Sequence, residues 1–392
     1  MQLDNYRACS AGETLERVSP FLRRLGITRL GRQTDLDDIG IPVWCAFSPN
    51  AKAIVIAQGK GMDDNAAKTS AAMEAIERSV ATNPACQLLV TSRQTLQASG
   101  HATDTLESLL SPHAKPVSPS EDINWARAQH LLTGHEIWVP FDAVHLDRTV
   151  TSPRYWQSSD GLASGNTRDE AVLHGLLERV ERDALTLWHA TPATKRYTSS
   201  IDTNAIAEPT LRNALAKISH AGLDIVLFDI TTDLRIPCIV ALMGPKNRAN
   251  TRSIRHVDIT YGAGASTSPA IAAIRAITEA AQSRITFIAG ARDDLLPDVF
   301  SRHADLMTVA ALATCPSKKL TDLPILSAKS TELSLQLVLE QLYNCSIQDL
   351  YAVDLAPEWL PASVVKVIAP QLENPDGERH RRLGSRALSK AL

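Results

Sequence analysis

Apolar residues along the chain alternate between helical and strand-like spacing without a regular order. Several long stretches place apolar side chains three or four residues apart, which is typical of helices with one buried face. Shorter aliphatic and β-branched runs are typical of strands. Because no steady βαβ series emerges, the pattern predicts an α/β fold of mixed α+β character. We expect helices at Glu13–Leu25, Asp63–Ala81, Arg168–Trp188, Ser268–Ala289 and Ser330–Leu342, and strands at Ile41–Phe47, Ala53–Ala57, Glu136–Val144, Ile225–Ile230, Pro237–Met243, Val257–Tyr261, Leu350–Asp354 and Val364–Ile368.

The composition is that of a globular protein without a strong charge of either sign. Hydrophobic residues make up 44% of the chain, charged residues 21%, and the formal net charge is −3. This balance provides no basic surface for nucleic acid. No segment approaches the roughly 20 apolar residues of a membrane-spanning helix, and none resembles a signal peptide. We therefore expect a cytoplasmic protein that binds neither nucleic acid nor membrane, with its six scattered cysteines reduced.

The most informative feature is a polar pattern that occurs on three of the expected helices. In each copy a first polar residue is followed by Glu four positions later, by Glu or Gln after three more, and then by Arg. Successive copies are about a hundred residues apart, which suggests a structural repeat. The copies are Ser70-x-x-x-Glu74-x-x-Glu77-Arg78, His174-x-x-x-Glu178-x-x-Glu181-Arg182 and Arg275-x-x-x-Glu279-x-x-Gln282-Ser283-Arg284.

These polar positions form a stripe on helices that are otherwise apolar. At 100° per residue, the first, fifth and eighth positions of a copy lie within roughly 60° of one another. A single copy would ordinarily be a solvated helix face with internal ion pairs. Three regular copies on apolar helices favour one buried cavity, where carboxylates recruit divalent cations such as Mg²⁺. The carboxylates are Glu74, Glu77, Glu178, Glu181 and Glu279, and Arg78, Arg182 and Arg284 offer forked donors to phosphate.

A glycine-containing turn is expected before each of the three helices. These segments are Gln58–Gly61, Asp160–Asn166 and Tyr261–Ser266. None matches a P-loop or a Rossmann glycine pattern. If ATP binds, its phosphates are therefore held chiefly by metal and side chains, with Lys60 as a candidate ligand.

Taken in order, these segments resemble the YcaO family over nearly the whole chain. The resemblance rests on Gly59-Lys60-Gly61, on the three helices, on Ser159-Asp-Gly-Leu-Ala-Ser-Gly-Asn166 and on Ile236-Pro237. Further segments look most like the stand-alone branch that works with a TfuA-type partner. They are Leu25–Arg29, Ile39–Pro42, Ala289–Asp294 and Val353–Leu355.

The resemblance implies a YcaO-type fold in which the three Glu-bearing helices surround a nucleotide cavity. Residues 1–50 would contribute to the nucleotide site, and residues 51–392 would form the catalytic domain, together as one unit. Mg²⁺ would be held by Glu74, Glu77, Glu178, Glu181 and Glu279. ATP would be contacted by Arg7, Thr14, Lys60, Ser70, Glu74, Arg78, His174, Gln282 and Arg284. No residue stands out as nucleophile or base.

The TfuA-associated branch is linked to thioamide formation in the backbone of ribosomally made peptides. A sulfur nucleophile would add to the amide carbonyl, the oxyanion would take the γ-phosphoryl group of ATP, and phosphate would leave. Azoline-forming cyclodehydration of Ser, Thr or Cys is the alternative, but those members end in Pro-x-Pro-x-Pro and this sequence ends Arg386-Ala-Leu-Ser-Lys-Ala-Leu392. It also has Ser266-Thr267-Ser268 where the family often has His-Pro-Asp. A non-catalytic nucleotide-binding scaffold is a third reading. Expected partners are a peptide substrate, a TfuA-like or sulfur-delivery protein and a second copy of the chain.

Overall fold

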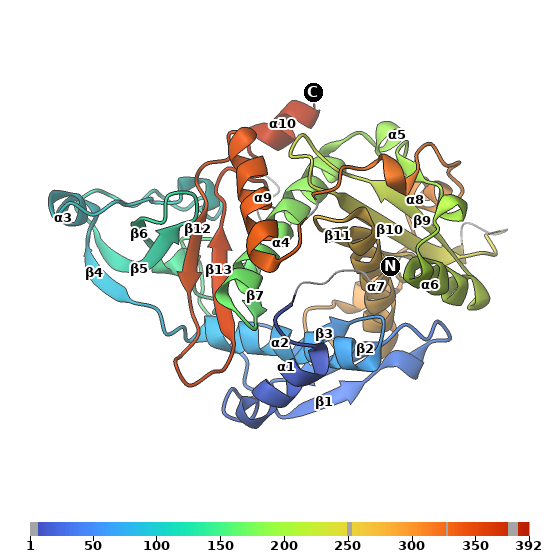
Figure 1. Cartoon of the computed structure of the whole chain (residues 1–392), viewed down its shortest axis with the longest axis horizontal. Coiled ribbons are helices and arrows are strands. Elements are labelled where there is room, and N and C mark those ends of the chain that lie inside the picture. The colour runs from blue at the N-terminus through green and yellow to red at the C-terminus, as the bar shows by residue number, and fades with distance from the viewer. Residues whose placement is uncertain (1–6, 249–252, 327, 375–382, 392) are drawn as a thin grey trace.

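The computed structural model describes residues 7–248, 253–326, 328–374 and 383–391, and its strands form three sheets (Figure 1). The sheets have the orders β1-β2-β3, β11-β10-β9-β8 and β4-β5-β12-β13-β7, with β6 paired to β5. Every pair of these strands is antiparallel. The strands are β1 Arg29–Arg32, β2 Val43–Phe47, β3 Ile56–Lys60, β4 Leu88–Ser92, β5 Asp122–His130, β6 Glu136–Pro140, β7 Leu162–Gly165, β8 Ser200–Ile201, β9 Leu223–Asp229, β10 Cys238–Pro245, β11 Thr260–Ala265, β12 Tyr351–Asp354 and β13 Ser363–Ile368.

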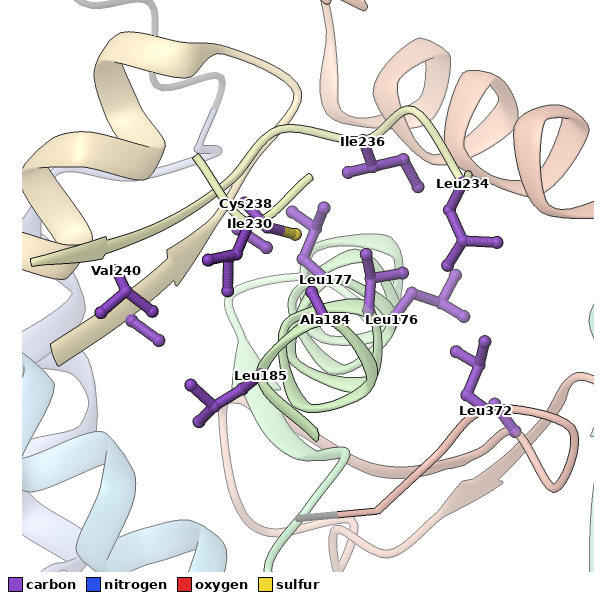
Figure 2. Packing of buried hydrophobic residues seen from close by; sticks show 14 of the residues in the cluster. Leu176, Leu177, Ala184, Leu185, Ile230, Leu234, Ile236, Cys238, Val240 and Leu372 are labelled. Atoms are coloured by element: carbon purple, nitrogen blue, oxygen red, sulfur yellow. The ribbon is translucent and has the colours of Figure 1, made fainter. Parts of the chain in front are cut away.

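Helix α4 lies between the two larger sheets and organises the main core (Figure 1). Its apolar residues face the chain around β10 on one side and β13 with the segment after it on the other. Figure 2 shows Leu176, Leu177 and Ala184 of α4 among Ile236 and Leu372. The helices are α1 Ala11–Val18, α2 Asp64–Thr82, α3 Arg93–Ala98, α4 Arg168–Ala190, α5 Ala193–Arg196, α6 Pro209–His220, α7 Pro269–Ala289, α8 Leu306–Ala311, α9 Thr331–Asn344 and α10 Ser385–Ala391.

A strand followed by a Glu-bearing helix occurs three times, as β3–α2, β7–α4 and β11–α7. The glycine segments expected as turns therefore lie largely in these strands, which corrects the sequence-based interpretation. Glycine is needed there because the helix packs directly against the strand. A Cβ on Gly59 would lie 2.0 Å from the backbone nitrogen of Ala71, and one on Gly262 would lie 2.4 Å from the carbonyl oxygen of Ala276.

Most expected elements are present, with shifts that have local causes. The first helix was expected to continue to Leu25 but ends at Val18, where Pro20 opens a 3-10 turn at Ser19–Phe21. The strand expected at Ala53–Ala57 instead begins at Ile56. Expected residues 257–261 contain the 3-10 turn His256–Asp258, and β11 begins only at Thr260. The mixed α/β class is confirmed.

The expected division at residue 50 falls between β2 and β3, which pair along their full length from Val43↔Lys60 to Phe47↔Ile56. That pairing supports the prediction of one integrated unit, which stays a prediction. None of the described helices combines the length and the apolar character needed to cross a membrane.

Candidate functional site

Each strand of the three strand–helix units contacts a glutamate on the helix of another unit, so that the contacts form a closed ring. The strand of the second unit contacts the glutamate of the first helix, the third strand contacts the second helix, and the first strand contacts the third helix. Because each helix depends on the strand of another unit, the glutamates are held by the fold as a whole. The contacts are Ser164 Oγ to Glu77 (2.6 Å), the Ala265 backbone nitrogen to Glu181 (3.1 Å) and Lys60 Nζ to Glu279 (2.5 Å).

Arg182 is the cation at the centre of this arrangement. Its guanidinium nitrogens lie 3.6 Å from oxygens of Glu178, Glu181 and Asp160. Burial disfavours its charge, but the attraction of Glu181, Glu178 and Asp160, with a contribution from Glu279, raises the pKa of Arg182 above its ordinary value. Side chains of α4 and α7 therefore belong to one connected charge network.

Two of the glutamates resist ionisation in the absence of a bound cation. Burial, reinforced by the charges of Glu74 and Glu178, raises the pKa of Glu77 to about 8. Burial likewise raises the pKa of Glu178 to about 7. At Glu279 burial acts in the same direction, but the nearby Lys60 prevails and holds the pKa below its ordinary value. Buried carboxylates with raised pKa values are a common mark of functional sites.

Three cationic side chains lie within electrostatic range of His174. Arg275 Nη2 lies 3.4 Å from His174 Nε2. Burial lowers the pKa of His174 well below its ordinary value, and the charges of Arg275, Arg7 and Lys60 lower it further. The imidazole is therefore neutral and can accept a hydrogen bond from Arg275. Three cations close together provide a surface suited to phosphate oxygens.

The N-terminal segment reaches this cluster through α4 and the residues before it. Thr14 Oγ1 donates to Asn166 Oδ1 (2.9 Å), and the backbone nitrogen of Ala8 donates to Glu170. Asn166 also donates from its own backbone nitrogen to Glu170 (2.9 Å). Arg7 is solvent-accessible but lies within electrostatic range of Glu170. The structure thus brings Arg7 and Thr14, named from the sequence, close to the repeated helices.

Two residues of α2, Arg78 and Ser70, are among the nucleotide contacts expected from the sequence. Arg78 pairs with Glu74 and donates from Nη1 to the carbonyl oxygen of Ile56 (3.0 Å). Ser70 is half-buried one turn before Glu74. Arg78 therefore neutralises a glutamate, whereas Ser70 is half-buried at the start of the stripe.

On α7, Gln282 and Arg284 lie at the edge of the charge network. Gln282 Nε2 donates to the carbonyl oxygen of Gln58 (3.1 Å). This bond leaves Gln282 Oε1 buried and without a hydrogen-bond partner among the described residues. Arg284 Nε lies 3.5 Å from the buried Asp37 Oδ2, which follows the 3-10 turn Thr34–Leu36. Gln282 Oε1 is thus an oriented acceptor held ready for a hydroxyl group or a cation.

The fit of a metal ion can be judged from these donors. Across the described ranges, no three His, Cys, Asp or Glu side chains lie close enough together to hold a metal ion. The glutamates are instead neutralised by Arg182, Lys60 and Arg78. The donors still suit Mg²⁺, because they are carboxylate oxygens beside an unpartnered amide oxygen, and Mg²⁺ commonly takes its other ligands from water and phosphate.

Several site residues were not chosen as ligands from the sequence. Asp160 and Glu170 lie within or beside the second repeat, and Asp37 lies far from any repeat. Arg275 occupies the first position of the third copy, where Ser70 and His174 stand in the other two. That equivalence was a usable signal for Arg275, whereas nothing local marks Asp37.

Comparison with known families and proteins identifies the family and the fold. Residues 58–373 match the family described as YcaO cyclodehydratase, ATP- and Mg²⁺-binding. An uncharacterized protein in the tfuA 3′ region of Rhizobium leguminosarum bv. trifolii is 36% identical over 388 residues, which cover 98% of this chain and 92% of that protein.

Two solved structures have the same fold. YcaO from Methanopyrus kandleri bound with AMPPCP and Mg²⁺ has a TM-score of 0.74 at 22% identity, covering 97% of this chain and 95% of that one. A heterocyclase in complex with substrate and cofactor has a TM-score of 0.77 at 20% identity, covering 96% of this chain and 55% of that one. This chain therefore spans about half of the heterocyclase. By its family match and its full-length relative, the chain belongs to the YcaO family, with ATP and Mg²⁺ as its cofactors.

Proposed function

We propose that the protein is an ATP- and Mg²⁺-dependent enzyme that converts a backbone amide of a ribosomally made peptide to a thioamide. The observation that carries the proposal is the charge network of the buried or half-buried Glu74, Glu77, Glu178, Glu181 and Glu279, together with the cations around His174. Such a network is costly to maintain in a folded protein unless a ligand of matching charge uses it.

The side chains divide into two groups by charge. The five glutamates, with Gln282 Oε1, would hold Mg²⁺, and Glu77 and Glu178 would lose their protons as they did so. Arg7, Lys60 and Arg275 would face phosphate oxygens, beside Ser70, Thr14, Arg78, His174 and Arg284. When bound, ATP supplies the phosphoryl group that makes the amide oxygen a leaving group, and Mg²⁺ neutralises its charge.

The chain itself contributes alignment and electrostatic stabilisation in a site held together from several elements. The overall reaction joins an amide, a hydrosulfide equivalent and ATP to give a thioamide, ADP and phosphate. The C–O bond breaks, a C–S bond forms, and the sulfur loses its proton. No described side chain has contacts that identify it as the general acid or base of this reaction.

The choice of thioamide formation is supported by the relative in the tfuA 3′ region. On that basis we expect a TfuA-like or sulfur-delivery partner, and a cytoplasmic location and self-association remain expectations. The family description and the heterocyclase favour a second candidate, which is cyclodehydration of Ser, Thr or Cys to an azoline.

The test is a reaction of the purified chain with ATP, Mg²⁺, sulfide and a candidate peptide encoded beside its gene, with and without a TfuA-like protein. Thioamide formation exchanges oxygen for sulfur, and mass spectrometry of the peptide would show that gain. Loss of one water at Ser, Thr or Cys would establish the azoline reaction instead. ATP binding without peptide-dependent ATP consumption would indicate the non-catalytic scaffold.

A further inference from the structure

One arginine of the C-terminal helix α10 forms ion pairs that link this helix to α4. Arg386 Nε and Nη2 each donate to Asp183 at 2.9 Å, one to each carboxylate oxygen. The same guanidinium donates to both oxygens of Asp233, from Nη1 at 2.9 Å and from Nη2 at 2.7 Å. The Asp183 side chain is 0% exposed, whereas that of Asp233 is 61% exposed. Arg386 is therefore the main neutralising partner of a fully buried carboxylate on α4.

Glu373 completes the attachment from the segment after β13. Its backbone nitrogen donates to Asp183 Oδ1 (2.9 Å), and its carboxylate accepts from the backbone nitrogens of Gly384 (2.8 Å) and Ala387 (2.9 Å). Figure 1 shows α10 against one end of α4. Glu373 directly follows Leu372, which packs with residues of α4 in the core shown in Figure 2.

The attachment is next to the glutamate network in sequence and is linked to it electrostatically through Arg179. Asp183 directly follows Arg182, which lies 3.6 Å from Glu178 and Glu181. One turn earlier, Arg179 donates from Nη2 to the carbonyl oxygen of Glu373 (2.9 Å). Arg179 Nη1 is buried and has no hydrogen-bond partner among the described residues. Arg179 is four residues before Asp183, on the same face of α4, and lies within electrostatic range of Asp183, Asp160 and Glu178. If Arg386 were lost, Asp183 would be a buried negative charge that competes for Arg179.

We propose that Arg386 is a positioning residue of the nucleotide site: by neutralising Asp183, it leaves the charge of Arg179 available to Glu178 and Asp160. The C-terminal helix is thereby coupled to Mg²⁺–nucleotide binding without contacting the nucleotide. This inference rests on the proposed nucleotide site, and it concerns binding only, not the reaction on the peptide.

The test measures binding of AMPPCP with Mg²⁺ to the full chain by calorimetry, without peptide. Arg386→Gln is expected to weaken binding roughly tenfold, a usual size for coupling between nearby networks. Arg386→Lys keeps the charge but loses the fork, so it should recover part of the affinity. The control Lys390→Gln removes a charge from the same helix on an exposed side chain and should bind like the wild type.

The decisive variant is the double substitution Asp183→Asn with Arg386→Gln, which removes both the buried charge and its partner. Affinity within about threefold of the wild type would support the inference, because no unpaired carboxylate then competes for Arg179. Equal weakening in the single and double variants would show a purely structural attachment and overturn it, as would unchanged binding by Arg386→Gln. If Arg386→Gln does not fold, Arg386→Lys and the double variant decide in the same way. A wild-type chain that fails to bind AMPPCP–Mg²⁺ would instead contradict the proposed function.

Discussion

Burial raises the pKa values of single glutamates at the site, and a bound cation would relieve that cost. Glu178 receives a hydrogen bond from the backbone nitrogen of Gly161 (3.2 Å) and an ion pair from Arg182, yet burial still raises its pKa to about 7. A glutamate that is only partly ionised at neutral pH is poorly compensated by the protein alone. Its role is therefore best examined by removing its charge at nearly constant shape.

Glu178→Gln should lower peptide-dependent ATP consumption by roughly a hundredfold or more, because the amide cannot replace a carboxylate ligand of Mg²⁺. The thermal midpoint without nucleotide should change little, since the glutamate is already partly neutral there. Glu358→Gln, at an exposed position, is the matched control and should keep full activity. Full ATP consumption by the Glu178 variant would remove that glutamate from the proposed metal site.

The raised pKa values also predict a dependence on pH. Glu77 titrates at about 8 in the folded protein against an ordinary value of 4.5. Between these values the folded chain holds a proton that the unfolded chain has lost, so the free energy of unfolding without ligand falls as pH rises through this window.

Bound Mg²⁺ must displace that proton, so stabilisation by AMPPCP–Mg²⁺ should grow from about pH 6 to about pH 8. Thermal unfolding with and without the ligand checks both trends, and Glu77→Gln should flatten the ligand-free trend. An equal gain in midpoint at every pH would mean that Glu77 keeps its proton in the complex.

At the scale of elements, the close contact between each strand and its helix gives a prediction about stability. Gly262→Ala should lower the free energy of unfolding by roughly 1–3 kcal/mol, because the new methyl group would meet backbone atoms of α7. Gly12→Ala is the control, since a Cβ there meets nothing within 4 Å and should if anything stabilise α1. Denaturant unfolding of both variants checks the contrast. Equal stability of the two would show that β11 and α7 can separate easily.

The same elements show how far the sequence could predict the structure. Long amphipathic helices such as α4 were found because their apolar spacing is locally visible. The sequence predicts turns over β7 and over most of β11, because Gly and Ala carry too little side chain to show the alternation of a strand. The sequence pattern also identifies the repeated glutamates, but it does not identify the side chains that contact them. Contacts such as Lys60 with Glu279 or Arg284 with Asp37 join distant parts of the chain, and only the folded arrangement reveals them.

At the scale of the whole molecule, the ring of contacts joins three units that are far apart in sequence. A ligand held by all three helices should therefore slow amide hydrogen exchange in α2, α4 and α7 together. Strands β4, β5 and β6 lie at the far end of the molecule from α7 in Figure 1 and should be unaffected. Hydrogen exchange with and without AMPPCP–Mg²⁺ measures this. Protection confined to a single helix would contradict a shared site.

The ring also has a consequence for synthesis on the ribosome. Glu74 and Glu77 emerge early. The glutamates of α4 follow after about one hundred further residues, and Glu279 of α7, which pairs with Lys60, follows only after about two hundred. At a translation rate of about 5–20 residues per second, the nascent chain waits on the order of ten seconds or more before its acidic side chains can be matched. We therefore expect nucleotide binding only late in synthesis. A chain that ends before α7 would lack Glu279 and could not complete the proposed site.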